Sequence, residues 1–444
     1  MNKVKGGLVS ADSTDWGSGH TGSGVRSRQR SPRIARSATV AAAALLAGAA
    51  QPALAATFFS PFATLGYEHN SNVFMRPSSA PPFAAQGITA LGDTILDHEG
   101  GMSGEFDWGP NRLTLDASAT RDQYDRFSFL NHYEYLFDGD LDWRLGPVVD
   151  GTATFEQTRY MAPFTNTFTT SLLLNTDRTA SVAVRVLMTP EWRLDLTPQL
   201  NEVDTPLPGF PDFKLTETSG AAGLDYLGFG KLTAGVLFTA DRGRYEGIAA
   251  ATRYQQREFD LTANYKVSGF SSLAASAGYT SRNSQVNPAD SIPAPAGVGA
   301  FAGYAGTVGT TSGATGALTY ERQFTGKTSG HISVFRRVES YAAGANPEIG
   351  AGGEVGLTWK ADPKITVSLT YGLARDQIEG GLIVVNIANR TDRTQTAAFD
   401  VRYAALSWLT VRPYVNWNKA ISTFTLGNYT ATIFGVDVTG RLRW

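Results

Sequence analysis

The last residues of the chain alternate strictly between apolar and polar side chains. From Phe434 to Trp444, every second residue is Phe, Val, Leu or Trp, with Gly440 as the exception, and polar residues or glycine lie between them. Successive side chains on a strand point to opposite faces, so this pattern predicts a strand with one apolar and one polar face. A half-buried strand of a soluble sandwich is one interpretation. The other is a membrane barrel, in which the apolar face meets lipid and the first strand pairs the edge.

The same alternation recurs along the rest of the chain. In the stretch 133–143, the aromatic residues Tyr133, Tyr135, Phe137 and Trp143 share one face, and acidic residues lie mostly on the other. From Thr57 onward we count eighteen such stretches, and several continue for about the ~9 to 11 residues that a tilted transmembrane strand needs. These stretches predict an all-β fold.

Short and long connections alternate between these stretches. The short ones use Gly, Pro, Asp or Ser, as tight turns do, near residues 109–110, 146–147, 190–191, 228–230, 268–269, 325–326, 362–363 and 406–407. Nine longer connections lie between them, including 70–94, 161–175, 203–214, 284–310 and 378–390. This rhythm predicts a transmembrane antiparallel up-and-down β-barrel of about 18 strands (16–18), with short periplasmic turns and long extracellular loops. Both termini are then periplasmic.

Tryptophan gathers near the short turns. A predicted periplasmic aromatic girdle consists of Trp108, Trp143, Trp192, Trp359, Trp408 and Trp444. Amphipathic rings prefer the head-group boundary of a bilayer, whereas a soluble sandwich gives tryptophan no reason to collect at one end. The barrel is therefore the interpretation that we adopt. Pro198 and Pro413 fall inside predicted strands, where each removes a ladder donor, so we expect a local bulge or a strand boundary there.

The N-terminal region is predicted to lie outside the barrel. Residues 26–55 combine several arginines, an apolar run from Ala38 to Ala50 and a small-residue site at 53–55, which is typical of a secretory signal peptide. Residues 1–25 are interpreted as a disordered extension or a misplaced start, and residues 56–444 as an outer-membrane β-barrel. Residues 56–444 carry 31 basic and 38 acidic side chains, a formal charge of −7 that disfavours nucleic-acid binding. Cysteine is absent, which excludes disulfides and thiolate metal sites.

The sequence provides little indication of catalysis. Histidine occurs at 69, 98, 132 and 331 of the predicted mature chain, and no nucleophile elbow, zinc-protease helix or calcium-loop motif accompanies them. His132, beside Glu134, and His331 are expected to face the lumen as polar residues. Asp138, Asp140 and Asp142 are either a cation site or a solvated, salt-bridged wall. We predict no enzyme, catalytic residue, cofactor or bound metal.

Charged residues are expected to line the lumen in two sectors. The predicted lumen-lining set consists of Glu105, Asp107, Asp116, Glu134, Asp138, Asp140, Asp142, Lys360, Arg402, Arg412, Arg441 and Arg443. Acidic residues come from early strands and basic residues from late strands, so closure would bring them together and create a field across the lumen. The alternative is that these charges only satisfy one another. About eighteen strands leave an aqueous channel unless a loop such as 284–310 or 70–94 folds inward.

The first predicted strand carries a family resemblance. Tyr67, Asn70, Asn72, Val73 and Phe74 form a Tyr-x-x-Asn-x-Asn-Val-Phe pattern. It resembles the opening of outer-membrane barrel proteins of exopolysaccharide operons, including porin-like barrels encoded with exosortase-linked genes. The resemblance implies a role in passing polysaccharide across the outer membrane, and Asn70, Asn72 and Phe74 would then shape the first external turn.

Three functions follow from these observations. The leading hypothesis is a passive hydrophilic conduit in the bacterial outer membrane that serves exopolysaccharide export. A general or nutrient diffusion porin and a non-conducting scaffold are the alternatives. The expected partners are outer-membrane lipid, the barrel-assembly machinery through the C-terminal strand, secreted polysaccharide and periplasmic export proteins.

Overall fold

The computed structural model of the chain describes residues 54–81, 83, 89–167, 170–206, 212–246, 253–285, 304–305, 309–340, 347–382 and 387–442. The first strand begins at Leu54, inside the predicted cleavage site, and the predicted extension and most of the signal peptide lie outside the described residues. Within the described residues, no helix has the length and apolar character that a membrane-spanning helix needs.

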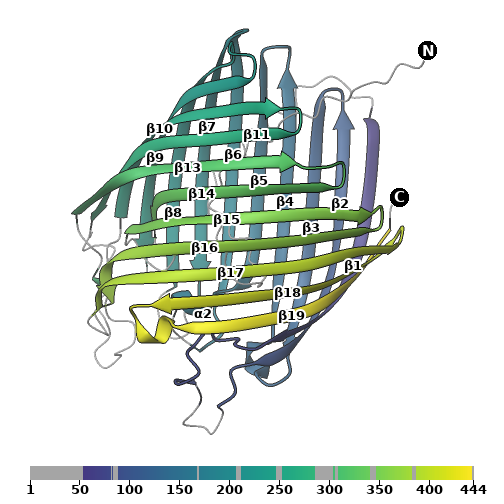
Figure 1. Ribbon diagram of the computed structural model, residues 1–444, viewed down its shortest axis with the longest axis vertical. Coiled ribbons are helices and arrows are strands. Elements are labelled where there is room, and N and C mark those ends of the chain that lie inside the picture. Colours follow the sequence, from purple (N-terminus) through teal and green to yellow (C-terminus); the bar gives the residue numbers. More distant parts are fainter. Residues whose placement is uncertain are drawn as a thin grey trace.

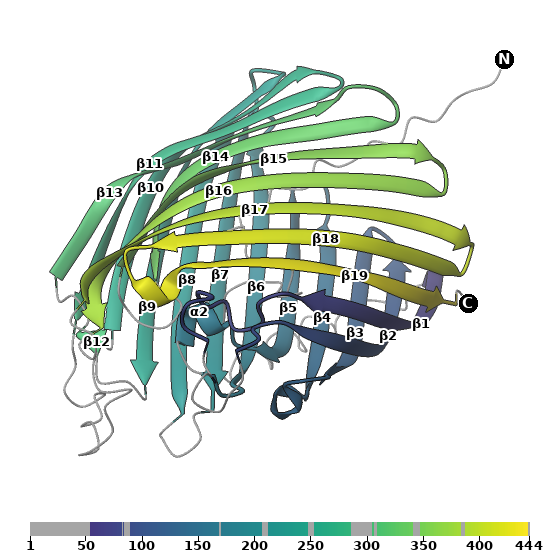
Figure 2. The ribbon, with the colours of Figure 1, turned by 60° about the horizontal axis from the view of Figure 1, so that its bottom comes forward.

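Eighteen long strands form one closed sheet (Figures 1 and 2). They are β1 (Leu54–Asn70), β2 (Asp93–Trp108), β3 (Asn111–Tyr124), β4 (His132–Leu145), β5 (Val149–Met161), β6 (Leu174–Thr189), β7 (Trp192–Thr205), β8 (Phe213–Tyr226), β9 (Leu232–Glu246), β10 (Arg253–Ser268), β11 (Ser271–Gln285), β13 (Gly309–Gln323), β14 (Thr328–Ser340), β15 (Pro347–Asp362), β16 (Ile365–Leu382), β17 (Ile387–Leu406), β18 (Leu409–Ser422) and β19 (Tyr429–Arg441). A two-residue strand, β12 (Tyr304–Ala305), adds to β16. The short helices are η2 (Ser128–Leu130), α2 (Phe164–Thr167) and η4 (Thr425–Gly427).

Each long strand pairs antiparallel with its neighbours in sequence, and β1 pairs with both β2 and β19. This last pairing closes the sheet, so it has no open edge. The predicted up-and-down barrel of eighteen strands is confirmed. Each of the eight predicted tight turns joins two strands at one end of the barrel, which we call the turn end, and the longer connections lie at the loop end. Gly109, Gly146 and Gly230 take positive φ values in these turns, a conformation that glycine adopts without strain.

The outer face of the barrel is apolar over most of its height. On β19, Phe434 and Val438 are 48% and 38% exposed, whereas Asp437 between them is 4% exposed and faces inward. Exposed aromatic and aliphatic side chains occupy the equivalent outward positions on the other strands, for example Leu261, Ile332 and Leu369. In a membrane these exposed side chains contact lipid, because a closed barrel satisfies its own backbone and needs no further cover.

The two prolines inside strands cause no bulge. Pro198 lies within β7 and pairs with Gly220, and Pro413 lies within β18 and pairs with Val436. On the other side of each strand the ladder has a gap, but the register is the same before and after it. The predicted bulge or boundary is therefore wrong. A slip of one residue would turn every following side chain to the opposite face, which costs more than one absent hydrogen bond.

Candidate functional site

The strand register identifies which residues face the interior of the barrel. A residue directly opposite an inward-facing residue of the neighbouring strand also faces inward. Glu105, Asp107, Asp116, Glu134, Asp138, Asp140 and Asp142 all occupy positions on this face of β2–β4. Lys360, Arg402, Arg412 and Arg441 occupy it on β15 and β17–β19. Arg443 lies outside the described residues. The register thus places the charges of early and late strands on the same inner surface.

Acidic residues dominate the inner face of β2–β5. This acidic wall consists of Asp93, Asp97, Glu99, Glu105, Asp107, Asp116, Asp122, Glu134, Asp138, Asp140, Asp142, Asp150 and Glu156. The lysine and arginine residues at inward positions of these four strands are Arg112 and Arg144. Asp138 lies directly between Asp116 on β3 and Glu156 on β5, so three carboxylates follow one another across neighbouring strands. The wall attracts cations because its carboxylates greatly outnumber its guanidinium groups.

Hydrogen bonds and ion pairs hold parts of this wall in place. The Arg112 Nε atom lies 2.8 Å from Asp107 Oδ1 and 3.4 Å from Glu105 Oε1. The Thr152 hydroxyl donates to Asp142 over 3.0 Å, and the Ser103 hydroxyl donates to Asp116 over 2.5 Å. The turn end of the wall is therefore partly neutralised by Arg112, while hydroxyl donors orient the carboxylates farther along it.

The basic residues of the late strands adjoin the acidic wall instead of lying across the lumen from it. Only β1 separates β19 from β2. The Arg412 guanidinium lies 3.7 Å from both Asp400 and Asp437, and the Arg441 guanidinium is 4.9 Å from the centre of the Phe62 ring. Lys360 and Arg402 are exposed on the inner surface. The two sectors therefore meet at β1, and the field across the lumen stays a prediction.

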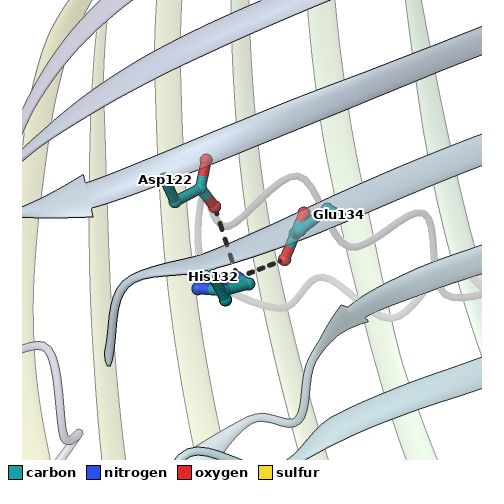
Figure 3. Close-up of side chains that lie close together, drawn as sticks. All are labelled: Asp122, His132 and Glu134. Carbon is teal, nitrogen blue, oxygen red and sulfur yellow. Dashed lines mark hydrogen bonds and ion pairs between the residues drawn. The ribbon is translucent and has the colours of Figure 1, made fainter. Parts of the chain in front are cut away.

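His132 lies between two carboxylates near the loop end of the acidic wall (Figure 3). Its Nδ1 atom is 2.7 Å from the Leu130 carbonyl oxygen, which can only accept, so Nδ1 carries a proton. Its Nε2 atom faces Glu134 Oε1 at 3.0 Å and Asp122 Oδ2 at 3.4 Å. Glu134 Oε1 also accepts a hydrogen bond from the backbone N–H of Met161. The cluster connects β3, β4 and the end of β5.

The same cluster contains the atoms that a divalent metal would need. The ligand atoms of Asp122, His132 and Glu134 all lie within 4.8 Å of one another. Imidazole nitrogen and carboxylate oxygen are common zinc ligands. With Nε2 protonated, however, the three side chains form an ion triad that needs no metal. The structure brings together His132 and Glu134, as predicted from their spacing, and adds Asp122.

His331 has a simpler environment on the opposite part of the inner wall. Its Nε2 atom lies 3.0 Å from Glu354 Oε1 on the neighbouring strand β15. Neither His132 nor His331 forms a hydrogen bond with a serine hydroxyl within the described residues. At these two histidines, the described geometry therefore shows no serine–histidine hydrogen bond of the kind that acyl transfer uses.

The first connection after β1 is a turn that one asparagine organises. The Asn72 side chain donates to the carbonyl oxygens of Arg76 and Thr430 and accepts the backbone N–H of Arg76. Asn70 accepts the backbone N–H of Asn72 over 2.9 Å. The Tyr-x-x-Asn-x-Asn-Val-Phe pattern therefore builds this turn and ties it to the start of β19. Burial lowers the pKa of the Arg76 guanidinium from its ordinary value.

Three connections pack together at the loop end. Phe74 is fully buried, and its ring lies 4.8 Å from that of Phe127 and 4.9 Å from that of Phe164. This aromatic cluster packs against Ile95 and Tyr124, which are inward-facing residues of β2 and β3. The connections β1–β2, β3–β4 and β5–β6 thus cover part of the inner wall at this end. The 284–310 connection, the other predicted inward loop, lies mostly outside the described residues.

Tryptophan lies at the turn end. Trp108 ends β2 and Trp192 begins β7, Trp143 and Trp359 lie two and three residues before the ends of β4 and β15, and Trp408 lies in the turn between β17 and β18. Trp192, Trp359 and Trp408 are 40–49% exposed. Trp444 lies outside the described residues. These five tryptophans thus share the turn end, and the periplasmic girdle stays a prediction.

One buried charge on the inner wall was not singled out from the sequence. Arg282 on β11 is 1% exposed, lies 3.5 Å from the centre of the Tyr254 ring and donates to Gln256 over 3.2 Å. Tyr254 in turn donates to Glu217. The alternation along β11 places Arg282 on the inner face. Its burial depends on residues of several other strands, and no local sequence pattern indicates those contacts.

A closed barrel with a lipid-facing outer surface and a charged inner surface resides in the bacterial outer membrane.

No family model and no curated protein matches the sequence. Among solved structures, the chain is similar to Pseudomonas aeruginosa OpdK determined with vanillate, at 12% identity and a TM-score of 0.45, covering 88% of this chain and 100% of that one. It is also similar to Pseudomonas aeruginosa OccK9 (OpdG), at 10% identity and a TM-score of 0.47, covering 89% and 100%. Acinetobacter baumannii OccAB3 gives 8% identity, a TM-score of 0.46 and coverage of 88% and 100%. Similarity at this level does not imply a shared function.

Proposed function

We propose that the protein is a passive diffusion channel for small hydrophilic solutes. The observation that carries this proposal is the closed barrel of eighteen long strands whose inner face is polar and charged. Barrels of this size enclose more space than their own inward side chains fill, and a polar interior holds water. The loop-end connections β1–β2, β3–β4 and β5–β6 cover one side of the entrance, because the aromatic cluster consists of residues from these connections and from β2, β3, β5 and β6.

We further propose that the channel prefers cations. The acidic wall contributes thirteen carboxylates against two arginines, and the basic Arg412 is partly neutralised by Asp400 and Asp437. A lumen wall with a surplus of one sign raises the local concentration of the opposite ion.

Export of exopolysaccharide has less support. The motif that suggested it forms a turn held by Asn72, and none of the comparisons points to polysaccharide. Secreted polysaccharide and periplasmic export proteins remain partners only of that second hypothesis. We retain the proposal that the barrel-assembly machinery recognises β19, whose apolar face and pairing with β1 complete the sheet.

Planar-bilayer recordings test the proposed channel. Purified, folded protein is expected to give stepwise ohmic currents, and a salt gradient across the bilayer is expected to give a reversal potential of the sign that cation preference produces. Small cationic metabolites should reduce the current at concentrations at which neutral oligosaccharides do not. A well-folded sample without single-channel current would favour the scaffold, and block by oligosaccharides alone would favour export.

A further inference from the structure

The outward face of the barrel carries a belt of basic residues near the loop end. We define the basic belt as the outward-facing Arg121, Arg159, Arg178, Lys214, Arg242, Arg244, Arg253, Arg257, Arg336, Arg375, Arg393 and Lys419. On each strand, the belt residue lies nearer to the loop end than most of the apolar outward residues. On β16, for example, Leu369, Tyr371 and Leu373 precede Arg375 on the same face.

Five residues of the basic belt lie at the same height, and the other seven lie 8 to 15 residues from the turn-end residue of their strand. Arg121, Arg159, Arg242, Arg375 and Lys419 each come ten residues after the first residue of their strand, counted from the turn end. Ten residues of strand span ~33 Å, and the tilt of barrel strands, ~35–45°, reduces this to a height of roughly 25 Å. The apolar band of outer-membrane barrels has the same height, about 25 Å. The belt therefore lies at the level of the lipid head groups on the loop side of the membrane.

The belt contains more positive charge than the protein itself neutralises. Among outward strand residues whose side chains the structure describes, the acidic ones are Glu202, Asp204 and Glu246. Glu202 pairs with Arg178 at 2.7 Å and with Lys214 at 3.6 Å, and Glu246 pairs with Arg244 at 3.3 Å. These pairs involve belt residues of β6, β8 and β9.

Elsewhere in the belt, like charges face each other. Arg375 on β16 is directly opposite Arg393 on β17, both are exposed, and neither forms an ion pair within the described residues. Like charges directly opposite on neighbouring strands destabilise a sheet. An anion placed between two such guanidinium groups would convert the repulsion into two attractive contacts.

We propose that the basic belt binds the phosphate groups of anionic lipids in the membrane leaflet on the loop side. Arginine presents a planar fork of N–H donors that matches phosphate, and basic clusters beside a membrane attract anionic head groups. A purely solubilising surface would mix both signs of charge. The turn end of the outer face lacks such a belt in the described strands, where Arg322 is the outward-facing arginine beside the tryptophan level.

Unfolding in vesicles of defined composition tests the proposal. The full chain is folded into vesicles of phosphatidylcholine alone or of phosphatidylcholine mixed with bisphosphorylated lipid A, and the urea concentration at half-unfolding is measured. The wild-type midpoint should rise when lipid A is present. The double variant Arg375→Gln/Arg393→Gln should have a higher midpoint than the wild type in phosphatidylcholine, because the repulsion is gone, and should gain less from lipid A.

Controls distinguish the belt from a general effect of charge. Arg322→Gln removes one outward arginine at the opposite end and should retain the full wild-type rise. The single variant Arg257→Gln provides a second measurement should the double variant fail to fold, and it should reduce the rise. Raising the salt concentration should also reduce the rise. Equal rises in all variants, or no rise in the wild type, would overturn the proposal, as would inorganic phosphate reproducing the full rise in phosphatidylcholine.

Discussion

At the scale of single residues, Asn72 connects the turn after β1 to β19 at the loop end of the barrel. Its amide group bonds both ends of the turn that it begins, and its bond to the Thr430 carbonyl reaches a strand 358 residues farther along the chain. Asn72 is 3% exposed, so water cannot replace these bonds. A buried polar group that loses its partner costs more than the bond itself contributes.

We therefore expect Asn72→Ala to lower the free energy of unfolding by about 2 kcal/mol, within the roughly 1–3 kcal/mol that an unsatisfied buried group costs. Urea unfolding of the barrel in detergent micelles measures this. Asn283→Ala is the matched control, because Asn283 is exposed on the outer face of β11 and should change stability by less than about 0.5 kcal/mol. Equal effects of the two substitutions would show that the turn does not stabilise the barrel.

The role of this turn was only partly predictable from the sequence. The pattern at Asn70, Asn72 and Phe74 indicated an external turn, and the structure forms one there. The contact with Thr430 could not be predicted, because it depends on the register with which β1 pairs β19. The sequence predicted that His132 and Glu134 both face inward, because residues two positions apart on a strand share one face. Asp122 joins them only through the pairing of β3 with β4.

At the scale of elements, the loop-end connections are stabilised by their own aromatic cluster. Phe74 is fully buried between Phe83, Phe127 and Phe164, and Arg76 nearby is 7% exposed. Truncating a buried phenylalanine costs about 3–5 kcal/mol. Because these connections can open without unfolding the barrel, the cost falls on their local stability.

Phe74→Ala should therefore make the Arg126–Phe127 peptide bond accessible to trypsin, because the Phe127 ring packs 4.8 Å from that of Phe74. A local loss of about 3 kcal/mol increases the open fraction by roughly 100-fold, and cleavage after Arg126 should accelerate by a similar factor when opening precedes cleavage. Mass spectrometry of the fragments over time measures the rate. Phe129→Ala is the control, since Phe129 is 50% exposed at the edge of the same cluster. An unchanged cleavage rate would mean that the connections are held by other contacts.

The strands themselves were the most predictable elements, and their prolines were the exception. Alternation and turn residues identified eighteen strands, because inward and outward environments differ so strongly. The prolines were misjudged, since a local rule considers the absent N–H and not the cost of shifting a whole register. At Pro413 the pairing with β19 is continuous, and the gap lies on the side of β17.

Pro413→Val should stabilise the barrel in a bilayer. The new N–H can donate to β17, and an unsatisfied backbone group in lipid costs several kcal/mol, whereas losing the proline's restriction of the unfolded chain costs about 0.4–1 kcal/mol. We expect a net gain on the order of 1 kcal/mol from urea unfolding in vesicles. The β17–β18 pairing is interrupted between the pairs Asp400–Tyr414 and Tyr403–Val411. A loss of stability would show that the backbone groups of β17 in this gap already have other hydrogen-bond partners.

At the scale of the whole molecule, the formal charge of −7 for residues 56–444 conceals a separation of charge. Carboxylates collect on the inner wall, and arginines and lysines collect in the outward belt at the loop end. The belt was visible in the sequence as a basic residue ten positions after several short turns. The belt was not predicted, because the outward face of a membrane barrel is expected to be apolar.

This separation leads to a prediction for ion selectivity. A unit charge ~10 Å from an ion in water contributes ~0.4 kcal/mol, so three carboxylates contribute about 1 kcal/mol before screening. The triple variant Asp138→Asn/Asp140→Asn/Asp142→Asn should therefore lower the ratio of cation to anion permeability by about two- to fivefold. Reversal potentials in a salt gradient measure this ratio.

Lys360→Gln/Arg402→Gln should change the permeability ratio in the opposite direction, because both residues are exposed on the inner face. Glu246→Gln removes a negative charge from the outer face and should leave the ratio unchanged. If Glu246→Gln changed the selectivity as much as the triple variant, the net charge of the protein, and not the acidic wall, would determine which ions pass.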